Sequence, residues 1–405
     1  MKLNPIINSL LETDMYKFSM GQVIFHQFNK DTTTWTFKCR NKDVKFTGEM
    51  IKEIREQIDH YCTLRFTKDE LDYLNNISWI SKDYVDFLKF WHPIREEILI
   101  NENYVQSYDT STCGLTIEAK GTWLNTSMYE IAILAIVNEV YFAFKYGESK
   151  FDTEFVDRTV AKFNDLLNGN YNIGTFSEFG MRRRYSSRMQ DWLIRYISDK
   201  NIPGFVGTSN VYLAKKYGIK PVGTMAHEYI MCVGQGHHEY NPAYSNKFAM
   251  KAWVKEYGVL NGIALTDTIT TDCFLKDFDL TYATLFNGVR HDSGDPIEFG
   301  EKMIKHYTSL GINPLTKTLL FSDSLNFEKA DKIRKHFEGR INCAFGIGTY
   351  LSNPLDNPLN MVMKVTECNG SPVAKISDTP GKGMCKNEEY VEYLTRSIEW
   401  RMKNS

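Results

Sequence analysis

The second half of the chain alternates short apolar runs with longer amphipathic stretches. The short runs predict buried strands, because glycine, proline and aspartate bound them, and the stretches between them have the spacing of helices. The expected strands are Ile173–Phe176, Gly204–Val206, Pro221–Gly223, Gly262–Thr266, Thr284–Asn287, Lys317–Phe321 and Asn342–Phe345. The expected helices are Ser187–Ser198, Asn210–Lys216, Asn246–Tyr257, Pro296–Ser309 and Asn326–His336. Strand-then-helix units repeated in this way favour an irregular α/β barrel over an open sheet.

The first third mixes strands and helices without regular alternation. The expected elements are a helix within Asn4–Ile24, a strand at Thr32–Arg40, two charged helices in Lys45–Leu74, a strand and hairpin in Tyr104–Glu118 with its turn near Thr112–Gly114, and a long apolar helix from Thr126 to Tyr146 that ends at Gly147. This order is typical of an α+β domain rather than of barrel units.

A hairpin and a helix follow the repeated units at the carboxyl end. Met361–Thr366 and Val373–Ile376 predict two strands joined at Asn369 and Gly370, and Glu388–Met402 predicts the last helix. We expect both to fold back onto the first domain.

The composition narrows the class of protein. With 405 residues, of which 42% are hydrophobic, the chain can bury a large core, and we expect two domains. The formal net charge of -2 argues against general nucleic-acid binding, although a small anionic ligand needs only a local basic pocket. The amino terminus lacks the apolar stretch of a signal peptide, and no run approaches a membrane span. The eight cysteines show no CxxC spacing, which favours reduced thiols in the cytoplasm.

Candidate chemistry begins in the segment Gly207–Met231. Ser209 or Asn210 can cap the helix that follows the strand at Gly204–Val206, and the next strand delivers His227 just past its carboxyl end. Ligands bind at that edge in α/β proteins, and neutral imidazole can serve there as a general base or accept a phosphoryl group. The alternative is a core histidine that donates to a backbone carbonyl.

Two further segments place charged residues just after predicted strands. Ser177–Arg184 ends in three consecutive arginines, where phosphates or a carboxylate would dock. In Gly288–Pro296, Arg290 stands beside Asp292 and Asp295. This arrangement suits a carboxylate clamp, ribose hydroxyls or a magnesium shell, or it is a salt-bridged turn with a helix cap.

A glycine-rich segment completes the set. Phe345–Thr349 (FGIGT) follows the last predicted strand, and its backbone amides could form a nest for a phosphate. Asp267 and Asp323 also end predicted strands. Because five strands end in polar or glycine residues, the sequence predicts a site for a phosphorylated sugar and a cation.

Together these motifs resemble the nicotinate phosphoribosyltransferase family, bacterial type. The resemblance rests on ETDMYKFSM (Glu12–Met20), EFGMRRR (Glu178–Arg184), GTSNVYLAKKYGIKPVGTMAHEY (Gly207–Tyr229), LTDT (Leu265–Thr268), VRHDSGDP (Val289–Pro296) and FGIGT (Phe345–Thr349). It implies an α+β sandwich-like domain from residues 1–140 and 360–405, and an incomplete α/β barrel of the type II phosphoribosyltransferase kind from residues 141–359. It also implies a cytoplasmic homodimer whose sites lie at the subunit boundary.

The implied reaction joins nicotinate to 5-phosphoribosyl 1-diphosphate, giving nicotinate mononucleotide and diphosphate, with coupled hydrolysis of ATP to ADP and phosphate. It is a step of NAD biosynthesis by salvage. Magnesium would be held mainly by diphosphate oxygens and water, so no all-protein ligand set is expected. The pair His237 and His238 is expected to be a surface loop rather than a metal site, because no matching ligand spacing accompanies it.

The resemblance also gives individual residues a role. It implies that ATP phosphorylates His227, that Phe179 and a partner subunit's copy of Tyr16 sandwich the pyridine ring, and that Arg290 meets the nicotinate carboxylate, with Arg182 near the same end or the ribose phosphates. Thr208 and Ser209 would contact substrate, and Asp292 and Asp267 would face the ribose and its developing positive charge. Gly346, Gly348 and Thr349 would cradle the 5-phosphate, and Lys375 and Ser377 would be partner-contributed phosphate contacts.

One departure bears on which pyridine is used. Nicotinamide-using relatives place an acidic residue in the loop that corresponds to Gly207–Asn210, whereas this chain has Ser209 and Asn210. We therefore expect no buried carboxylate that would repel nicotinate. The alternatives are a nicotinamide or quinolinate phosphoribosyltransferase on the same scaffold, and a sugar-phosphate-binding barrel without transferase activity.

Overall fold

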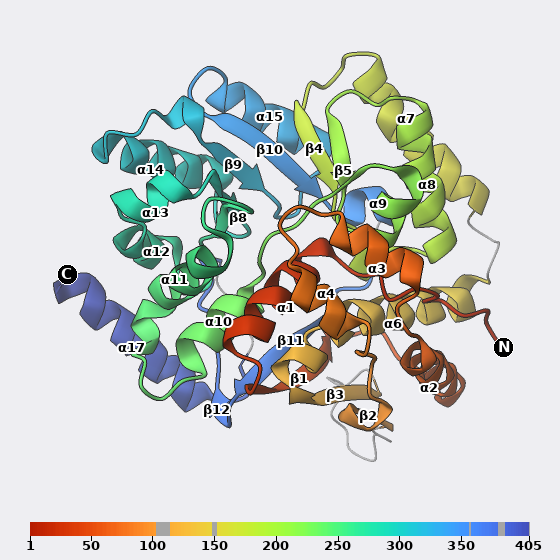
Figure 1. Ribbon diagram of the computed structural model, residues 1–405. Coiled ribbons are helices and arrows are strands. Elements are labelled where there is room, and N and C mark those ends of the chain that lie inside the picture. Colours follow the sequence, from red (N-terminus) through yellow and green to blue (C-terminus); the bar gives the residue numbers. More distant parts are fainter. Residues whose placement is uncertain (103–113, 148–151, 356–357, 380–384, 405) are drawn as a thin grey trace.

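The computed structural model describes residues 1–102, 114–147, 152–355, 358–379 and 385–404. Its framework is one antiparallel sheet and one curled parallel sheet, which lie side by side with helices around both (Figure 1). The expected class, an incomplete α/β barrel beside an α+β part, is confirmed. The domain boundaries near residues 140 and 360 stay predictions, because one buried apolar cluster runs through both parts.

Both ends of the chain build the antiparallel sheet. Within the described residues its order is β12-β11-β1-β3-β2. The strands are β1 (Thr32–Cys39), β2 (Ile98–Glu102), β3 (Leu115–Thr122), β11 (Met361–Cys368) and β12 (Ser371–Pro372). β11 pairs along the whole of β1, from Thr33 opposite Cys368 to Cys39 opposite Met361, with a bulge between Thr34 and Trp35. The predicted return of the carboxyl-terminal hairpin to the first part is therefore correct.

The parallel sheet has the order β6-β5-β4-β10-β9-β8-β7 in the described part of the chain. Its strands are β4 (Thr175–Glu178), β5 (Phe205–Thr208), β6 (Lys220–Pro221), β7 (Ile263–Leu265), β8 (Gly288–His291), β9 (Thr318–Phe321) and β10 (Asn342–Ile347). The first and last strands, β4 and β10, are neighbours, so the sheet curls as a barrel does, but β6 and β7 do not pair. A side chain crosses this opening, since Thr224 Oγ1 donates to the carbonyl of Ile263 at 3.0 Å.

Helices surround both sheets. Those of the antiparallel part are α1 (Met15–Gln27), α2 (Gly48–Thr63), α3 (Lys68–Asn75), α4 (Lys82–Leu88), η1 (Arg95–Glu97), α5 (Trp123–Thr126) and α6 (Tyr129–Tyr146). Those that follow are α7 (Asp152–Leu167), η2 (Met181–Arg183), α8 (Ser187–Asp199), α9 (Val211–Tyr217), α10 (His227–Gln235), η3 (Pro242–Tyr244), α11 (Ser245–Tyr257), α12 (Thr271–Asp277), α13 (Leu280–Leu285), α14 (Pro296–Ser309), η4 (Pro314–Thr316), α15 (Phe327–Phe337), α16 (Thr349–Ser352) and α17 (Glu388–Asn404). Some of these helices, such as α6 and α10, lie between the antiparallel sheet and the barrel.

Capping residues begin or end several of these helices where the sequence predicts. Asp295 accepts from the backbone amides of Ile297 and Glu298 and so caps α14. Thr67 and Glu70 form the expected capping box of α3. Gly218 ends α9 in the left-handed region with φ 63°, which glycine adopts without strain.

The predicted strand at Thr284–Asn287 is wrong. Asp279 accepts from the amides of Thr281 and Tyr282 and starts helix α13, which takes up the first part of that apolar run. The strand is β8, four residues later, and it carries Arg290 and His291. The missed helix α13 explains the error, because an aspartate cap outweighed a short apolar run. The predicted hairpin turn at residues 112–113 lies outside the described residues.

The last helix also differs from the expectation. α17 packs beside η3 and α12 of the parallel part rather than on the antiparallel sheet (Figure 1). Its buried Arg401 donates to both carboxylate oxygens of Asp277, at 2.6 and 3.0 Å. The chain therefore crosses from one sheet to the other between β12 and α17, which brings Lys375, Ile376 and Asp378 to the carboxyl edge of the barrel.

The long apolar helix is a core helix. Trp123–Tyr146 is long and apolar enough to cross a membrane by length and composition, but 89% of its apolar window is buried within the protein. Core helices of this kind pass the same test.

Candidate active site

The carboxyl ends of the parallel strands open onto a cleft of ≈ 370 Å³. Phe179 and Arg182 follow β4, Arg290 and Asp292 lie at the end of β8, and Gly346, Gly348 and Thr349 lie at or just after the end of β10; all of them line this cleft. Because parallel strands end at one edge of a sheet, residues far apart in sequence meet there. The structure thus brings the predicted strand-end residues to one place.

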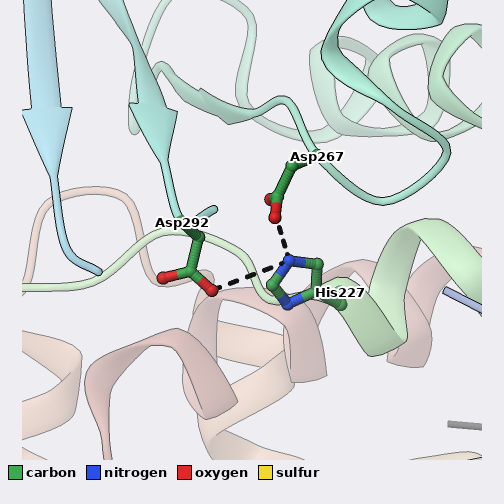
Figure 2. A group of neighbouring side chains, drawn as sticks. All are labelled: His227, Asp267 and Asp292. Atoms are coloured by element: carbon green, nitrogen blue, oxygen red, sulfur yellow. Dashed lines mark hydrogen bonds and ion pairs between the residues drawn. The ribbon is translucent and has the colours of Figure 1, made fainter. Parts of the chain in front are cut away.

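A cluster of charged or titratable side chains lies at the wall of this cleft, and Figure 2 shows three of them, His227, Asp267 and Asp292. His227 is the first residue of α10, and its Nε2 lies 2.9 Å from Asp267 Oδ1 and 3.7 Å from Asp292 Oδ2. Lys375 Nζ lies 2.8 Å from the same nitrogen and donates to Asp267 Oδ2 at 2.7 Å. The three predicted catalytic residues and Lys375 are therefore in direct contact.

The protonation states of this cluster follow from burial and charge. Burial and then the ammonium group of Lys375 lower the pKa of His227, so the imidazole is neutral near pH 7. Burial opposes ionisation of Asp267, but His227 and Lys375 hold its pKa well below the ordinary value. Nε2 contacts both Asp267 and the ammonium of Lys375, and the tautomer in which Nε2 donates to Asp267 leaves the lone pair on Nδ1.

Backbone pairing places Lys375 in the cluster. The amide of Ile376 donates to the carbonyl of Thr268 at 2.8 Å, and the amide of Thr270 donates to the carbonyl of Ile376 at 3.0 Å. These bonds hold the segment after β12 beside the loop that follows β7. Lys375 is thus opposite Asp267 in the same chain, and the expectation of a partner-contributed lysine stays a prediction.

Arg290 is fixed by three contacts around its guanidinium. It donates to Asp292 Oδ1 at 2.9 Å, to Ser322 Oγ at 2.8 Å and to the carbonyl of Met225 at 3.2 Å. Burial opposes ionisation of Asp292, but Arg290 and then His227 lower its pKa below the ordinary value. The arginine is therefore rigidly oriented toward the cavity, as recognition of a carboxylate requires.

The cleft is strongly basic. Its cationic lining residues are Arg40, Arg182, Arg183, Arg290, Lys364 and Lys375, whereas Asp292 and Asp323 are its acidic ones. Burial, Lys375 and Arg40 lower the pKa of Lys364 to about 8, which reflects this positive surplus. Such a potential attracts polyphosphates. Arg40 and Lys364 were not predicted from the sequence. Arg40 follows β1 and Lys364 lies in β11, so both come from the antiparallel sheet and not from the end of a barrel strand.

The glycines of the FGIGT segment line the cleft together with Thr349. Gly346 has no positive φ, so a left-handed backbone is not the reason for glycine at this position. A Cβ atom on Gly346 would instead overlap the ring of Phe179. Gly346 therefore fixes where that ring lies, in addition to any contact with a phosphate.

A smaller cavity of ≈ 90 Å³ adjoins the cleft inside the barrel. Tyr16, Phe179, Arg182, Ser209 and Arg290 are among its lining residues. Two aromatic rings, two guanidinium groups and a hydroxyl suit a flat ring with one anionic substituent. Tyr16 and Phe179 of one chain line the same cavity, and the expectation that a partner subunit's Tyr16 completes the sandwich stays a prediction.

Some predicted contact residues lie elsewhere. Thr208 is fully buried and donates to Glu178 Oε2 at 2.6 Å, and it does not line either cavity. Ser377 Oγ donates to Ser293, which in turn donates to Asp267. Asp267 itself is 1% exposed and is held by His227 and Lys375. Thr208, Ser377 and Asp267 therefore support the residues that face the cleft.

Arg184 also departs from the prediction. Its guanidinium is buried and donates to Glu12 at 3.1 Å and to the carbonyl of Ile6 at 3.2 Å. Of the three consecutive arginines only Arg182 and Arg183 line the cleft. The third anchors the amino-terminal segment beneath the loop.

A buried carboxylate reaches the pyridine-sized cavity, contrary to expectation. Asp14 lines it, is 3% exposed and accepts from Ser209 Oγ at 2.6 Å. The loop Gly207–Asn210 carries no acidic residue, as the sequence shows, but the chain before α1 pairs with it through a bridge between Asp14 and Asn210. The expectation considered only the loop Gly207–Asn210, whereas the carboxylate comes from Asp14, in the segment before α1.

The fit of a divalent cation is poor among the protein groups. His227, Asp267 and Asp292 lie close enough together to share an ion. The ammonium of Lys375 already contacts His227 and Asp267, and Arg290 pairs with Asp292, so the carboxylate charges are matched. Mg²⁺ prefers oxygen ligands, and here the phosphates of a substrate would have to supply them.

Profiles of known families match both parts of the chain. The nicotinate phosphoribosyltransferase (NAPRTase) family matches residues 175–400, and the NAPRTase N-terminal domain matches residues 11–138. The chain belongs to the nicotinate phosphoribosyltransferase family. Within that family, the chain is an α/β enzyme of the pentosyl-transferring kind that serves NAD salvage.

Individual members of the nicotinate phosphoribosyltransferase family are similar over nearly the whole length. The nicotinate phosphoribosyltransferase of Ralstonia pickettii is 43% identical over 393 residues, which is 96% of this chain and 98% of that protein. The crystal structure of the Vibrio cholerae enzyme has a TM-score of 0.90 at 34% identity and covers 98% of this chain and 96% of that one. A putative nicotinate phosphoribosyltransferase from Saccharomyces cerevisiae has a TM-score of 0.88 at 34% identity, covering 99% and 100%.

Proposed function

We propose that the protein couples the transfer of phosphoribose to nicotinate to the hydrolysis of ATP, through a phosphohistidine at His227. The observation that carries this proposal is the neutral imidazole, held by Asp267 and Lys375, in a cleft lined by six cations. A polyphosphate attracted to that cleft would lie against a nucleophilic nitrogen.

The phosphoryl step can be written from this geometry. The lone pair on Nδ1 of His227 attacks the γ-phosphorus of ATP, the bond from that phosphorus to the β,γ-bridging oxygen breaks, and ADP leaves. Nε2 keeps its proton, and Asp267 stabilises the charge that the ring gains. Water later cleaves the phosphorus–nitrogen bond, which restores the imidazole and releases phosphate.

The pentosyl step uses the neighbouring residues. The ring nitrogen of nicotinate attacks C1 of 5-phosphoribosyl 1-diphosphate, the bond from C1 to the diphosphate oxygen breaks, and diphosphate leaves. Tyr16 and Phe179 would bind the ring, and Arg290 or Arg182 the carboxylate. The ionised Asp292 faces the cleft and would stabilise positive charge on the ribose. Mg²⁺, bound through diphosphate and water, would neutralise the leaving group.

Radioactive labelling tests the proposal. We expect wild-type protein incubated with γ-labelled ATP to gain phosphate that is labile in acid and stable in alkali, and His227→Ala to gain none. His238→Ala is the matched control, because His238 is an exposed histidine remote from the cluster and should label as the wild type does. Equal labelling of His227→Ala would remove His227 from this role.

The choice of pyridine is tested by kcat/KM for nicotinate, nicotinamide and quinolinate. We expect nicotinate to be preferred, since the small cavity offers two guanidinium groups and a volume of only ≈ 90 Å³. Preference for either other pyridine would favour the corresponding alternative.

Two properties of the whole protein belong to the same proposal. We infer a cytoplasmic location, because the eight cysteines show no CxxC spacing and so favour reduced thiols. We also propose that the protein is a homodimer, as the resemblance to the family implies. Sedimentation velocity at enzyme concentrations used for assays would show which state is active.

A further inference from the structure

The pair formed by Asp14 and Ser209 lines the pyridine-sized cavity but has no part in the mechanism above. Ser209 Oγ donates to Asp14 Oδ1 at 2.6 Å, and this is the hydrogen bond that the described residues give to the Asp14 side chain. While the hydroxyl donates to Asp14, its oxygen offers only lone pairs to a ligand. Both side chains are less than a tenth exposed, so water cannot replace a missing partner.

Several charged groups surround Asp14. Arg182 of the loop after β4 and Lys17 of α1 favour its ionised form, whereas Glu130 of α6 and Glu178 of β4 oppose it. Lys17 is itself committed to Glu130 and Glu228, at 2.7 and 2.8 Å. A nicotinate carboxylate that enters the cavity would therefore add a further negative charge beside a buried carboxylate.

We propose that Asp14 takes up a proton when nicotinate binds, and that Ser209 then reverses its hydrogen bond and donates to the nicotinate carboxylate. The proton comes from solvent and bonds to a carboxylate oxygen of Asp14, so that Asp14 becomes the donor to Ser209 Oγ. Arg290 is already paired with Asp292, and Arg182 with Glu130, so two desolvated carboxylates in one cavity would both stay ionised only at a cost, which a proton on Asp14 removes. Asp14 and Ser209 thus determine specificity together, and the inference rests on nicotinate being the pyridine substrate.

The same relay predicts how the choice of pyridine depends on pH. With Asp14 ionised, Ser209 can only accept, which suits the amide N–H of nicotinamide; with Asp14 protonated, Ser209 donates, which suits a carboxylate. Affinity for nicotinate should therefore fall as pH rises, and affinity for nicotinamide should fall less. Nicotinate itself stays anionic as the pH rises above neutrality, so the change in its affinity reports on a group of the protein.

Calorimetry of nicotinate binding in two buffers of different ionisation enthalpy tests the proposal. We expect the wild type to take up close to one proton, and its affinity for nicotinate to fall by up to about tenfold per pH unit above the pKa of Asp14. Asp14→Asn should take up none and show a flat profile, because an amide can donate to Ser209 at every pH. Ser209→Ala should keep the proton uptake but lose affinity.

A second measurement needs no variant to fold. Difference infrared spectroscopy of the wild type should show the stretch of a protonated carboxyl group when nicotinate is added. Nicotinate binding without this band and without proton uptake would overturn the inference and leave the enzymatic function intact. Uptake that persists in a folded Asp14→Asn would also overturn it. Absence of any nicotinate binding would overturn the inference together with the substrate assignment.

Discussion

Single residues at the cleft owe their chemistry to neighbours from other elements. His227 has a lowered pKa because it is buried beside Lys375, and Lys375 is there because Ile376 pairs with residues 268–270. The sequence predicted His227, Asp267 and Asp292 from their places after strands, and the structure brings them into contact. It could not show which of them faces the cleft, because side-chain direction depends on packing.

Lys375→Met should shift the pH dependence of the labelling of His227. Without the ammonium group the pKa of His227 rises, since burial alone then opposes the charge that Asp267 and Asp292 favour. The reactive neutral ring is lost as pH falls through that pKa, so the acid limb of single-turnover labelling by ATP should move to higher pH. The control is Lys302→Met, an exposed lysine on α14. A lower rate with an unshifted acid limb would contradict the assignment.

Glu178→Gln should disturb the pyridine site without touching substrate. The buried carboxylate accepts hydrogen bonds from the backbone amide of Gly180, from Thr208 and from Gln190. In Glu178→Gln the side-chain NH₂ group would face these hydrogen-bond donors instead of an acceptor oxygen. We expect a loss of about 1–3 kcal/mol in unfolding free energy. Because Phe179 adjoins Gly180, KM for nicotinate should rise more than KM for 5-phosphoribosyl 1-diphosphate. An equal rise in both would show a general loss of structure.

At the scale of elements, strand ends and the loops after them decide the site. Patterns of apolar residues predicted most barrel strands and helices, and capping residues fixed their ends, as at Asp295. The strand at Thr284–Asn287 failed because the cap at Asp279 was not recognised. Three site residues could not be predicted for another reason. Arg40, Lys364 and Asp14 reach the cleft or the small cavity from elements outside the barrel.

Gly346→Ala should show how one strand end positions a ring from the next strand. β10 and β4 are paired, and an added Cβ would overlap the Phe179 ring. The ring must then turn away, so KM for nicotinate should rise roughly tenfold, the equivalent of about 1.4 kcal/mol of lost stacking. Gly48→Ala is the matched control, because its Cβ would meet open space. Unchanged nicotinate kinetics with a folded protein would contradict this role.

At the scale of the whole molecule, the two sheets are tied together by the ends of the chain. The amino-terminal segment pairs with the loop after β5, and β11 completes the antiparallel sheet. The chain then crosses to the barrel, passes Lys375 and ends in α17. Neither crossing has a signature in apolar periodicity, which is why the sequence placed α17 on the wrong part.

Arg401→Met should loosen this last attachment. The side chains of Arg401 and Asp277 are 5% and 1% exposed, so the substitution leaves a buried carboxylate unpaired. We expect about 3–5 kcal/mol less unfolding free energy in urea. The double variant with Asp277→Leu should recover much of the loss, because replacing a buried ion pair by apolar groups costs little.

Leu394 and Ile398 of α17 share an apolar cluster with Ala374. The single variant should therefore also label His227 more slowly, since Lys375 follows Ala374, and the double variant should regain the rate. Equal losses in the single and double variants would mean that α17 is held by packing and not by this pair.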